Sequence, residues 1–265
     1  MTEVAKKAEG VLFDIVHDIA AERLRPGDRL PSQTTMMSRY RTGATPLREA
    51  LRMLELAGLV TLRPGPAAGA LVQAASAEHL AALVAPFLCV AGVTYGELLD
   101  AWIATEPLLA AAAAGNPDRA SVVMELASFA AEAESDDPVP PSHAIDFHDA
   151  VAKASGNAAL ALVLQVLSYV VADLYWRSTA AIPPGGQVRH DHHEISEAIL
   201  AGEADRARRS MEAHCRIMSE RILDRIGHGR DEPFMWPRRP AGMAVYRQRP
   251  LARAGQGAAA DGSAK

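Results

Sequence analysis

Three histidines, His148, His192 and His214, fall on three segments whose apolar spacing predicts helices. Imidazole nitrogens bind divalent metals such as Zn(II), Ni(II) or Mn(II) when they converge in a polar pocket. Residues this far apart converge only through the fold, and taken singly each is more often an ordinary surface or core histidine than a ligand. His193 adjoins His192, and the two cannot both point inward from one helix face, so the residues alone leave that choice open.

A second group of residues has the chemistry to contact DNA. A recognition helix enters the major groove with its N-terminal end, and arginine hydrogen-bonds to guanine edges and to phosphates. Arg48, near the start of an expected helix, is the best single candidate for such a contact. The alternative is that Arg48, Glu49 and Arg52 form an ordinary solvated helix face. The candidate DNA contacts in this region are Arg39, Arg41, Thr45, Arg48 and Arg52.

The elements around these arginines have the order of a winged helix-turn-helix. Helices are expected over residues 8–24, from 32 to about 40 and from about 45 to 57, separated by Pro-Gly and Gly-containing turns. Residues 59–72 read as two short strands around a Pro/Gly tip. Arg63 and Gly65 at this tip are further candidates for DNA contact, because glycine permits close approach to the backbone or minor groove.

From residue 76 onward the sequence shows almost no strand signal. Helices are expected at about 78–90, 94–114, 117–135, 143–155, 158–181, 188–201 and 204–227. The predicted fold class is therefore mainly α: an N-terminal winged helix-turn-helix followed by an all-α helical bundle. The expected domains are 1–75 for DNA binding, 76–228 for effector binding and dimerisation, and 229–265 as a disordered basic tail.

Composition limits the class of protein. The chain has 265 residues and 49% hydrophobic residues, which is ample material for a core. No apolar run approaches the ~20 residues that span a bilayer, and two cysteines make no disulfide framework, so we expect a cytoplasmic protein without membrane contact. Residues 1–75 carry 10 basic and 8 acidic side chains, whereas residues 76–228 carry 10 and 21. The acidic central block is therefore not expected to face phosphate.

Two runs of sequence resemble a known family. The run 26-PGDRLPS-32, followed by 46-PLREALRMLELAGLV-60 and a glycine-containing wing, resembles the GntR family of bacterial transcription regulators. The helical remainder is similar to the FadR-type effector domain of that family, called FCD, through 146-DFHDAVAKASGN-157 and 192-HHEISEAILAGEADRARRSMEAH-214. The resemblance covers roughly residues 8–228.

The resemblance implies which residues contact the operator, and the chain departs from it at several of them. The family usually has a Ser-Arg pair where this chain has Gly43-Ala44, and an arginine where it has Thr34. Arg48 is retained. Either the operator differs, with Arg39 and Arg41 compensating, or DNA binding is weak. A good bidentate Arg–guanine contact contributes ~1–3 kcal/mol of discrimination, so the usual base readout cannot be carried over whole.

The resemblance also selects the histidines. Metal-containing FCD domains have a histidine after the Phe of a D-x-x-F-H motif, one before an Ala-Ile pair, and one 22 residues later, which correspond to His148, His192 and His214. The fourth family ligand is an Asp at the position of Ala144. The implied site is three histidines without the carboxylate, holding one divalent metal ion (Zn, Ni or Mn) with an open position. An apo pocket is the alternative.

A further departure concerns the small-molecule effector. FCD domains that bind small carboxylates carry an arginine four residues before a glutamate, and these positions are Trp102 and Glu106 here. An indole offers an apolar wall and one N–H donor in place of an arginine fork, which favours a larger or more apolar effector. The expected pocket comprises Trp102, Glu106 and the three histidines. The alternative is that Trp102 only packs in the core.

The leading prediction is a ligand-responsive transcription regulator, not an enzyme, that binds double-stranded operator DNA as a homodimer and responds to a small-molecule effector. One alternative is a metal-dependent helical enzyme, although no nucleophile–base pair or paired carboxylates accompany the histidines. The other is a GntR-like accessory protein with weakened DNA recognition, which the two missing arginines keep open.

Overall fold

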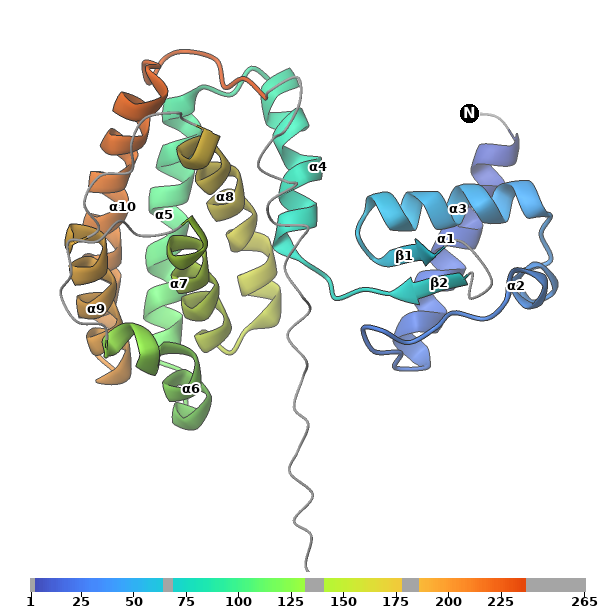
Figure 1. Cartoon of the computed structure of the whole chain (residues 1–265), viewed down its shortest axis with the longest axis horizontal. Helices are drawn as coiled ribbons and strands as arrows, with labels where there is room; N and C mark the ends of the chain where they lie inside the picture. Colours follow the sequence, from blue (N-terminus) through green and yellow to red (C-terminus); the bar gives the residue numbers. More distant parts are fainter. Residues whose placement is uncertain (1–2, 64–68, 132–140, 178–185, 237–265) are drawn as a thin grey trace, which may run out of the picture.

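The computed structural model describes residues 3–63, 69–131, 141–177 and 186–236. Figure 1 shows two bodies joined by the segment between β2 and α4, which covers residues 73–76. The elements are α1 (Glu3–Ala21), α2 (Gln33–Arg39), α3 (Ala44–Leu56), β1 (Val60–Arg63), β2 (Gly69–Val72), α4 (Ala77–Val90), α5 (Tyr95–Ala114), α6 (Arg119–Ala130), α7 (Pro141–Ala154), α8 (Ala158–Arg177), α9 (Gly186–Leu200) and α10 (Ala204–Ile226).

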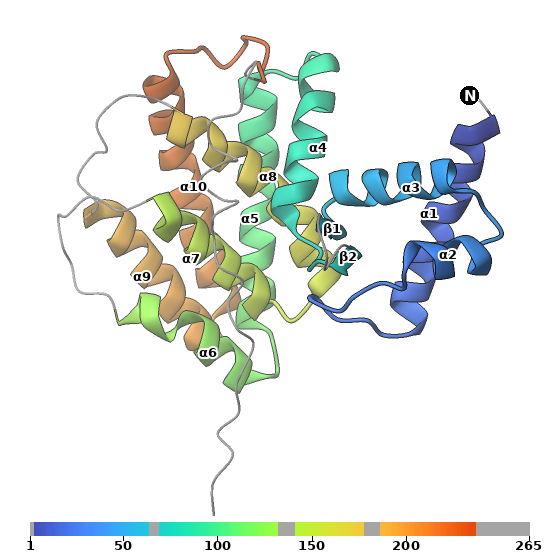
Figure 2. The same cartoon turned by 45° about the vertical axis from the view of Figure 1, so that its right-hand side comes forward.

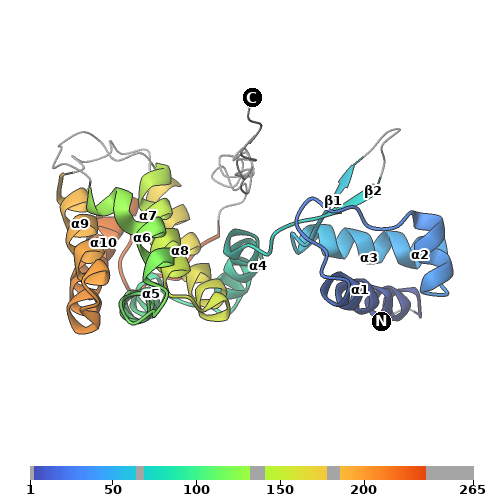
Figure 3. The same ribbon diagram turned by 90° about the horizontal axis from the view of Figure 1, so that it is seen from below.

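The N-terminal body has its own core. Apolar residues of α1, α2 and α3 meet those of the hairpin in one buried cluster that includes Ile15, Met36, Leu47, Leu54 and Val60. The strands β1 and β2 pair antiparallel, from Val60 opposite Val72 to Arg63 opposite Gly69. Figure 3 shows α3 between α1 and this hairpin. Burial of one face of α3 fixes its other face toward solvent.

Local signals explain the helix boundaries in this body. The side chain of Ser32 caps α2 by accepting a hydrogen bond from the backbone N–H of Thr35, 3.1 Å away. Gly43 is the N-cap of α3 and provides no side-chain cap. Beyond α3, Gly58 has a φ of +72°. A β-carbon built there would lie 2.3 Å from Cγ of His79 on α4, so the turn needs glycine for its conformation and for this close approach.

The C-terminal body is an all-helical bundle of α4 to α10 organised around α5. Helix α5 contacts α7, α8, α9 and α10, and Figure 2 shows these helices packed about it. Its buried residues form one broad face, which recurs along the whole helix from Tyr95 to Ala114 and packs against these neighbours. Thr94 and Glu97 form a reciprocal capping box at its first turn. A charged residue in this helix, Glu106, is therefore carried into the middle of the bundle.

The chain after α10 packs on the start of α5 as a C-terminal strap, residues 228–236. The carbonyls of Arg230 and Glu232 accept hydrogen bonds from the backbone N–H groups of Gly96 (2.8 Å) and Tyr95 (3.0 Å). Phe234 is buried with its ring edge-on to Tyr95. The sequence alone placed the end of the packed chain at residue 228, and the structure extends it to residue 236. Residues 237–265, most of the expected basic tail, lie outside the described residues.

The predicted fold class is confirmed: the chain is mainly helical, with a two-strand wing in the N-terminal body and a helical bundle after it. The tip of the wing, which includes Gly65, lies outside the described residues. Across the described ranges, no helix is both long enough and apolar enough to cross a bilayer.

Candidate metal centre and DNA interface

The exposed face of α3 carries the predicted DNA-contacting side chains. Thr45, Arg48 and Arg52 are exposed and follow one another at intervals of three and four residues, which places them on one face. The opposite face buries Leu47 and Leu54. In the part of the chain that the structure describes, no carboxylate pairs with Arg48 or Arg52, so both guanidinium groups are available to a ligand.

Arg39 has a different environment from Arg48. Its guanidinium lies 3.0 Å from Asp18 and 2.7 Å from Glu22, both on α1. The hydroxyl of Tyr40 donates a hydrogen bond to Asp18 over 2.8 Å, and burial together with Asp18 raises the pKa of Tyr40 to about 12. These contacts tie the end of α2 to α1. Arg39 was predicted to compensate for missing arginines, and its ion pairs favour a structural role instead.

Two further predicted residues flank α3. Arg41 is exposed in the turn before α3 and has a φ of +47°, a conformation that is uncommon for residues other than glycine. Arg63 is exposed at the end of β1.

A contact that sequence reasoning missed joins the wing to α3: Glu55 accepts a hydrogen bond from the backbone N–H of Leu62 over 2.9 Å. Nothing in the spacing of the sequence signals this contact.

The three predicted histidines converge inside the bundle. His148 comes from α7, His192 from α9 and His214 from α10, and all three are buried. One ligand nitrogen from each lies within 4.8 Å of the others. The ring centroids of His192 and His214 are 5.0 Å apart, and that of His148 is 5.7 Å from His214. Nitrogens this close in a buried pocket have the arrangement of a metal ligand set.

Carboxylates contact two of these rings at Nδ1. Nδ1 of His148 lies 2.8 Å from Oε2 of Glu106, and Nδ1 of His214 lies 3.0 Å from Oδ2 of Asp191. An ionised carboxylate only accepts hydrogen bonds, so each Nδ1 donates and each Nε2 keeps a free lone pair. This carboxylate–histidine arrangement is the one that orients imidazoles toward a metal. Sequence reasoning placed Glu106 in an effector pocket and did not identify Asp191.

His192 differs from the other two. It is completely buried, and neither of its ring nitrogens has a hydrogen-bond partner among the described residues. Its ring stacks on Phe147 with centroids 3.8 Å apart. Burial, with added repulsion from His214, His148 and His143, holds the pKa of His192 well below its usual value. A buried imidazole without hydrogen-bond partners lowers the stability of the fold. The neutral imidazole is also the form that binds a metal, so the three histidines fit a metal ion.

The pKa values of Glu106 and His214 are also shifted in this site. Burial alone raises the pKa of Glu106, but the charge and hydrogen bond of His148 outweigh burial and the net pKa is lowered. Ser168 of α8 also donates a hydrogen bond to Glu106. For His214, burial lowers the pKa more than Asp191 raises it. The site therefore combines two imidazoles whose protonation burial disfavours, His192 and His214, with a third, His148, that is held by Glu106.

The position that the family fills with an aspartate is Ala144 on α7, which is partly buried. Neither Glu106 nor Asp191 replaces this ligand, because each carboxylate binds the Nδ1 side of a histidine. The ring of the neighbouring His143 stacks on His192 with centroids 5.6 Å apart. The structure thus brings together three candidate histidine ligands, and among the described residues no carboxylate of α7 joins them.

Trp102 lies beside this centre. It is buried, its ring centroid is 5.9 Å from that of His148, and its Nε1 has no hydrogen-bond partner among the described residues. On the side of α9 and α10, a cavity of about 230 Å³ reaches Asp191 and His214. Among the three histidines this cavity is lined by His214 alone, on the side of its partner Asp191.

Comparisons with known proteins identify the domain type of each body. Residues 7–69 match the model of the bacterial regulatory proteins of the gntR family, and residues 97–216 match the FCD domain. The HTH-type transcriptional repressor NanR of Enterobacter sp. (strain 638) is 24% identical over 219 residues, which cover 81% of this chain and 84% of the relative. NanR of Escherichia coli (strain K12) is 23% identical over 227 residues, 81% of this chain and 83% of the relative.

A solved structure, that of Streptococcus agalactiae GntR, superposes with a TM-score of 0.57 at 20% identity, covering 80% of this chain and 99% of that one. This likeness supports the fold alone. The two family matches fall on the two bodies of the structure, and they belong to transcriptional regulators rather than to enzymes. With its N-terminal winged helix-turn-helix and its C-terminal FCD domain, the chain belongs to the GntR family of bacterial transcription regulators.

Proposed function

We propose that this protein is a ligand-responsive regulator whose winged domains bind operator DNA and whose helical domain senses a small molecule. In this assignment residues 1–75 bind DNA, residues 76–228 bind the effector and dimerise, and residues 229–265 form a basic tail. Two copies would place two α3 helices on a pseudo-palindromic operator in the cytoplasm. The similarity to a family of transcriptional repressors supports repression as the mode of action.

The DNA-binding part rests on Arg48 and Arg52 of α3. Both side chains are exposed, and within the described chain neither forms an ion pair. Arg48 is the proposed base contact, and Thr45, Arg41, Arg52 and Arg63 are proposed to contact phosphates or neighbouring bases. A mobility-shift titration with the DNA upstream of the protein's own gene tests this part. Specific binding that Arg48→Ala greatly weakens supports it, and binding unchanged by that substitution contradicts it.

The observation that carries the sensing part is the orphaned imidazole of His192 between two carboxylate-backed histidines. We propose that His148, His192 and His214 hold one divalent metal ion, which would supply an open coordination position for an oxygen of the effector. Trp102 would provide an apolar wall for that effector. Metal analysis of protein purified without a His-tag, after supplementation with Zn(II), Ni(II) or Mn(II) in turn, tests the site: about one equivalent is expected, and much less contradicts it.

A second candidate is a regulator-like accessory protein with weakened operator recognition. It is favoured by one observation: Arg39, a proposed compensator for the missing arginines at Ala44 and Thr34, is held by Asp18 and Glu22. The salt dependence of DNA binding separates the two candidates. A regulator binds its operator at least about 10³-fold more tightly than other DNA, whereas an accessory protein of this kind binds all DNA alike.

A further inference from the structure

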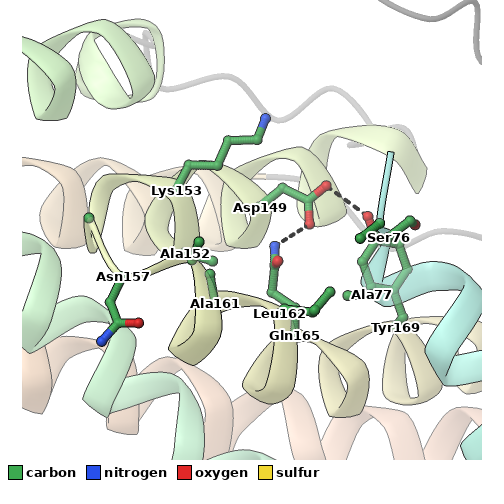
Figure 4. Close-up of a pocket in the computed structure, with 13 residues that line it drawn as sticks. Ser76, Ala77, Asp149, Ala152, Lys153, Asn157, Ala161, Leu162, Gln165 and Tyr169 are labelled. Carbon is green, nitrogen blue, oxygen red and sulfur yellow. Dashed lines mark hydrogen bonds between the residues drawn. The ribbon is translucent and has the colours of Figure 1, made fainter. Parts of the chain in front are cut away.

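A groove lies where the linker enters the helical body, and we call it the linker groove. It has a volume of about 510 Å³ and is lined by the start of α4, by α7 and by α8. Figure 4 shows Asp149 and Lys153 of α7 on one wall, with Tyr169 of α8 beside the linker residue Ser76. Its volume falls within the range of about 300–1,000 Å³ that is common for small-molecule sites.

The linker groove is separate from the histidine centre. His148 and Asp149 are consecutive on α7, so their side chains leave the helix in different directions. His148 reaches Glu106 of α5, whereas Asp149 reaches α8 and accepts hydrogen bonds from Gln165 Nε2 at 2.6 Å and from the Tyr169 hydroxyl at 2.8 Å. The two adjacent residues therefore face different parts of the bundle, His148 toward α5 and Asp149 toward α8.

The wall of the linker groove carries one charge of each sign. A carboxylate has about four acceptor positions, and two hydrogen bonds leave Asp149 able to accept more. Lys153 lies one helical turn beyond Asp149, and its nearest ion-pair partner, Glu125, is 3.9 Å away with the lysine side chain 63% exposed. Asp149 is thus held by α8, Lys153 extends from the next turn of α7, and both charges line the groove.

Beside polar side chains such as that of Asn157, the lining includes an apolar surface. Ala152, Ala158, Ala161 and Leu162 form the surface between the two charges and the linker. Residues this small leave room for an apolar group, and they have no polar atoms beyond the backbone that a polar ligand would satisfy. The groove therefore combines a charged wall with an apolar surface, which suits an amphipathic molecule.

We propose that the linker groove binds a zwitterionic amphiphile of the amino-acid class, with its ammonium group on Asp149, its carboxylate on Lys153 and its side chain on the alanine-lined surface. The charges argue for this class over simpler ones. A lone amine would be repelled by Lys153, and a lone carboxylate would be repelled by Asp149. A zwitterion satisfies both charges with charge-assisted hydrogen bonds.

A ligand in the linker groove would contact the segment that leads to the DNA-binding body. Ser76 caps α4 and lines the groove together with Ala77. In the same turn of α4, His79 lies against Gly58 at the end of α3. Occupancy is therefore expected to change the placement of α3 and, with it, operator affinity. This last step rests on the proposed DNA-binding function, whereas binding itself does not.

Isothermal titration of the full-length protein tests binding directly. The probes are L-phenylalanine, phenethylamine and 3-phenylpropanoate, which share one apolar body and differ only in their charged groups. We expect L-phenylalanine to bind at least about tenfold more tightly than either of the others. Asp149→Asn and Lys153→Gln should each weaken it about tenfold or more, which corresponds to ~1.4 kcal/mol.

Ala158→Phe fills the groove without changing its charge and should abolish binding. Ala159→Phe is its matched control, because Ala159 is the next residue of α8, is exposed and does not line the groove. Thermal melts of each variant confirm that it folds. Absence of heat with L-phenylalanine, equal affinity for phenethylamine, or intact binding in Ala158→Phe would overturn the proposal.

Operator titrations with and without saturating L-phenylalanine test the coupling. A shift in operator affinity that Ala158→Phe removes supports it. Ligand binding without such a shift, in protein that does bind its operator, overturns the coupling and leaves the site standing. Loss of operator binding under all conditions contradicts the proposed function, and the calorimetry still decides whether the groove is a site.

Discussion

Glu106 of α5 and His148 of α7 are joined inside the helical bundle by a contact of 2.8 Å between Oε2 and Nδ1. Glu106 is 1% exposed, so a charge that the sequence places on an Ala- and Leu-rich helix is almost completely removed from water. Such a group is tolerated only when it is paired and hydrogen-bonded. Its pairing fixes the ring of His148 and turns Nε2 toward the other two histidines.

Glu106→Gln should weaken metal binding about 10- to 100-fold, because the carboxylate that orients His148 through Nδ1 would be replaced by a neutral amide. Asp191→Asn, which changes the partner of His214, should have an effect of the same size. Competition with a chelator of known affinity measures both. Glu97→Gln on the first turn of α5 is the control, since among the described residues Glu97 bonds only within its capping box. Metal affinity equal to wild type in Glu106→Gln would contradict the role of Glu106.

His192→Leu should remove the stabilisation by metal while sparing the apo protein. Both nitrogens of His192 are buried without partners among the described residues, so an apolar residue of similar size removes a polar group that the core leaves unsatisfied. We expect the apo variant to melt at or above the temperature of apo wild type. Added metal should raise Tm for wild type only, and a raised Tm in the variant would exclude His192 as a ligand.

The apo protein should lose stability as the pH falls below about 6.5, the ordinary pKa of histidine. The folded-state pKa of His192 and of His214 is lowered, chiefly by burial, so the unfolded chain binds protons that the folded chain does not. Stability is then complete above the unfolded pKa and declines toward acid, by up to ~1.4 kcal/mol per pH unit for each histidine. Urea unfolding from pH 7.5 to 5.5, with chelator present, measures this slope, and His192→Leu should reduce it.

Arg48→Ala and Arg39→Ala should separate DNA contact from structural support. Arg48 is exposed and unpaired within the described chain, so its loss should weaken specific operator binding about tenfold or more without changing Tm. Arg39 pairs with Asp18 and Glu22, and its loss should lower Tm slightly and affect operator binding less. Fluorescence anisotropy and thermal melts of both variants check this, and the reverse pattern would assign the base contact to Arg39.

Gly58→Ala should destabilise the protein more than Gly92→Ala. Both glycines have a φ just above +70°, but a β-carbon at Gly58 meets His79 at 2.3 Å, whereas one at Gly92 meets nothing within 4 Å. The cost at Gly92 is then conformational, about 1 kcal/mol, and the cost at Gly58 includes a clash. The double variant Gly58→Ala/His79→Ala should recover the difference, and additive effects in this double-mutant cycle would refute the contact.

The sequence predicts what depends on local spacing and leaves open what depends on packing between distant segments. The apolar stripes and Gly/Pro breaks placed nearly every helix, and Ser32 and Gly58 mark two of the boundaries correctly. The convergence of the three histidines came from family resemblance, because residues on three helices share no local geometry. That convergence is present in the structure.

The partners of these residues could not be predicted in the same way. Glu106 and His148 are 42 residues apart, and Asp191 meets His214 across 23 residues. The ion pairs of Arg39 with α1 and the packing of Phe234 on Tyr95 are likewise set by the angle at which helices cross. A one-residue rotation of either helix would break such pairs without changing any pattern in the sequence.

The C-terminal strap has a mechanical consequence for sensing. It begins at the end of α10 and binds the first turn of α5 through two backbone hydrogen bonds and the second turn through the ion pair between Arg230 and Asp100. Helices α5 and α10 thus pack against each other along their length and are also linked by the strap at one end. We therefore expect these two helices to move least in the bundle. Any movement that a ligand causes should then belong to α7 and α9, which carry His148 and His192 against these two helices.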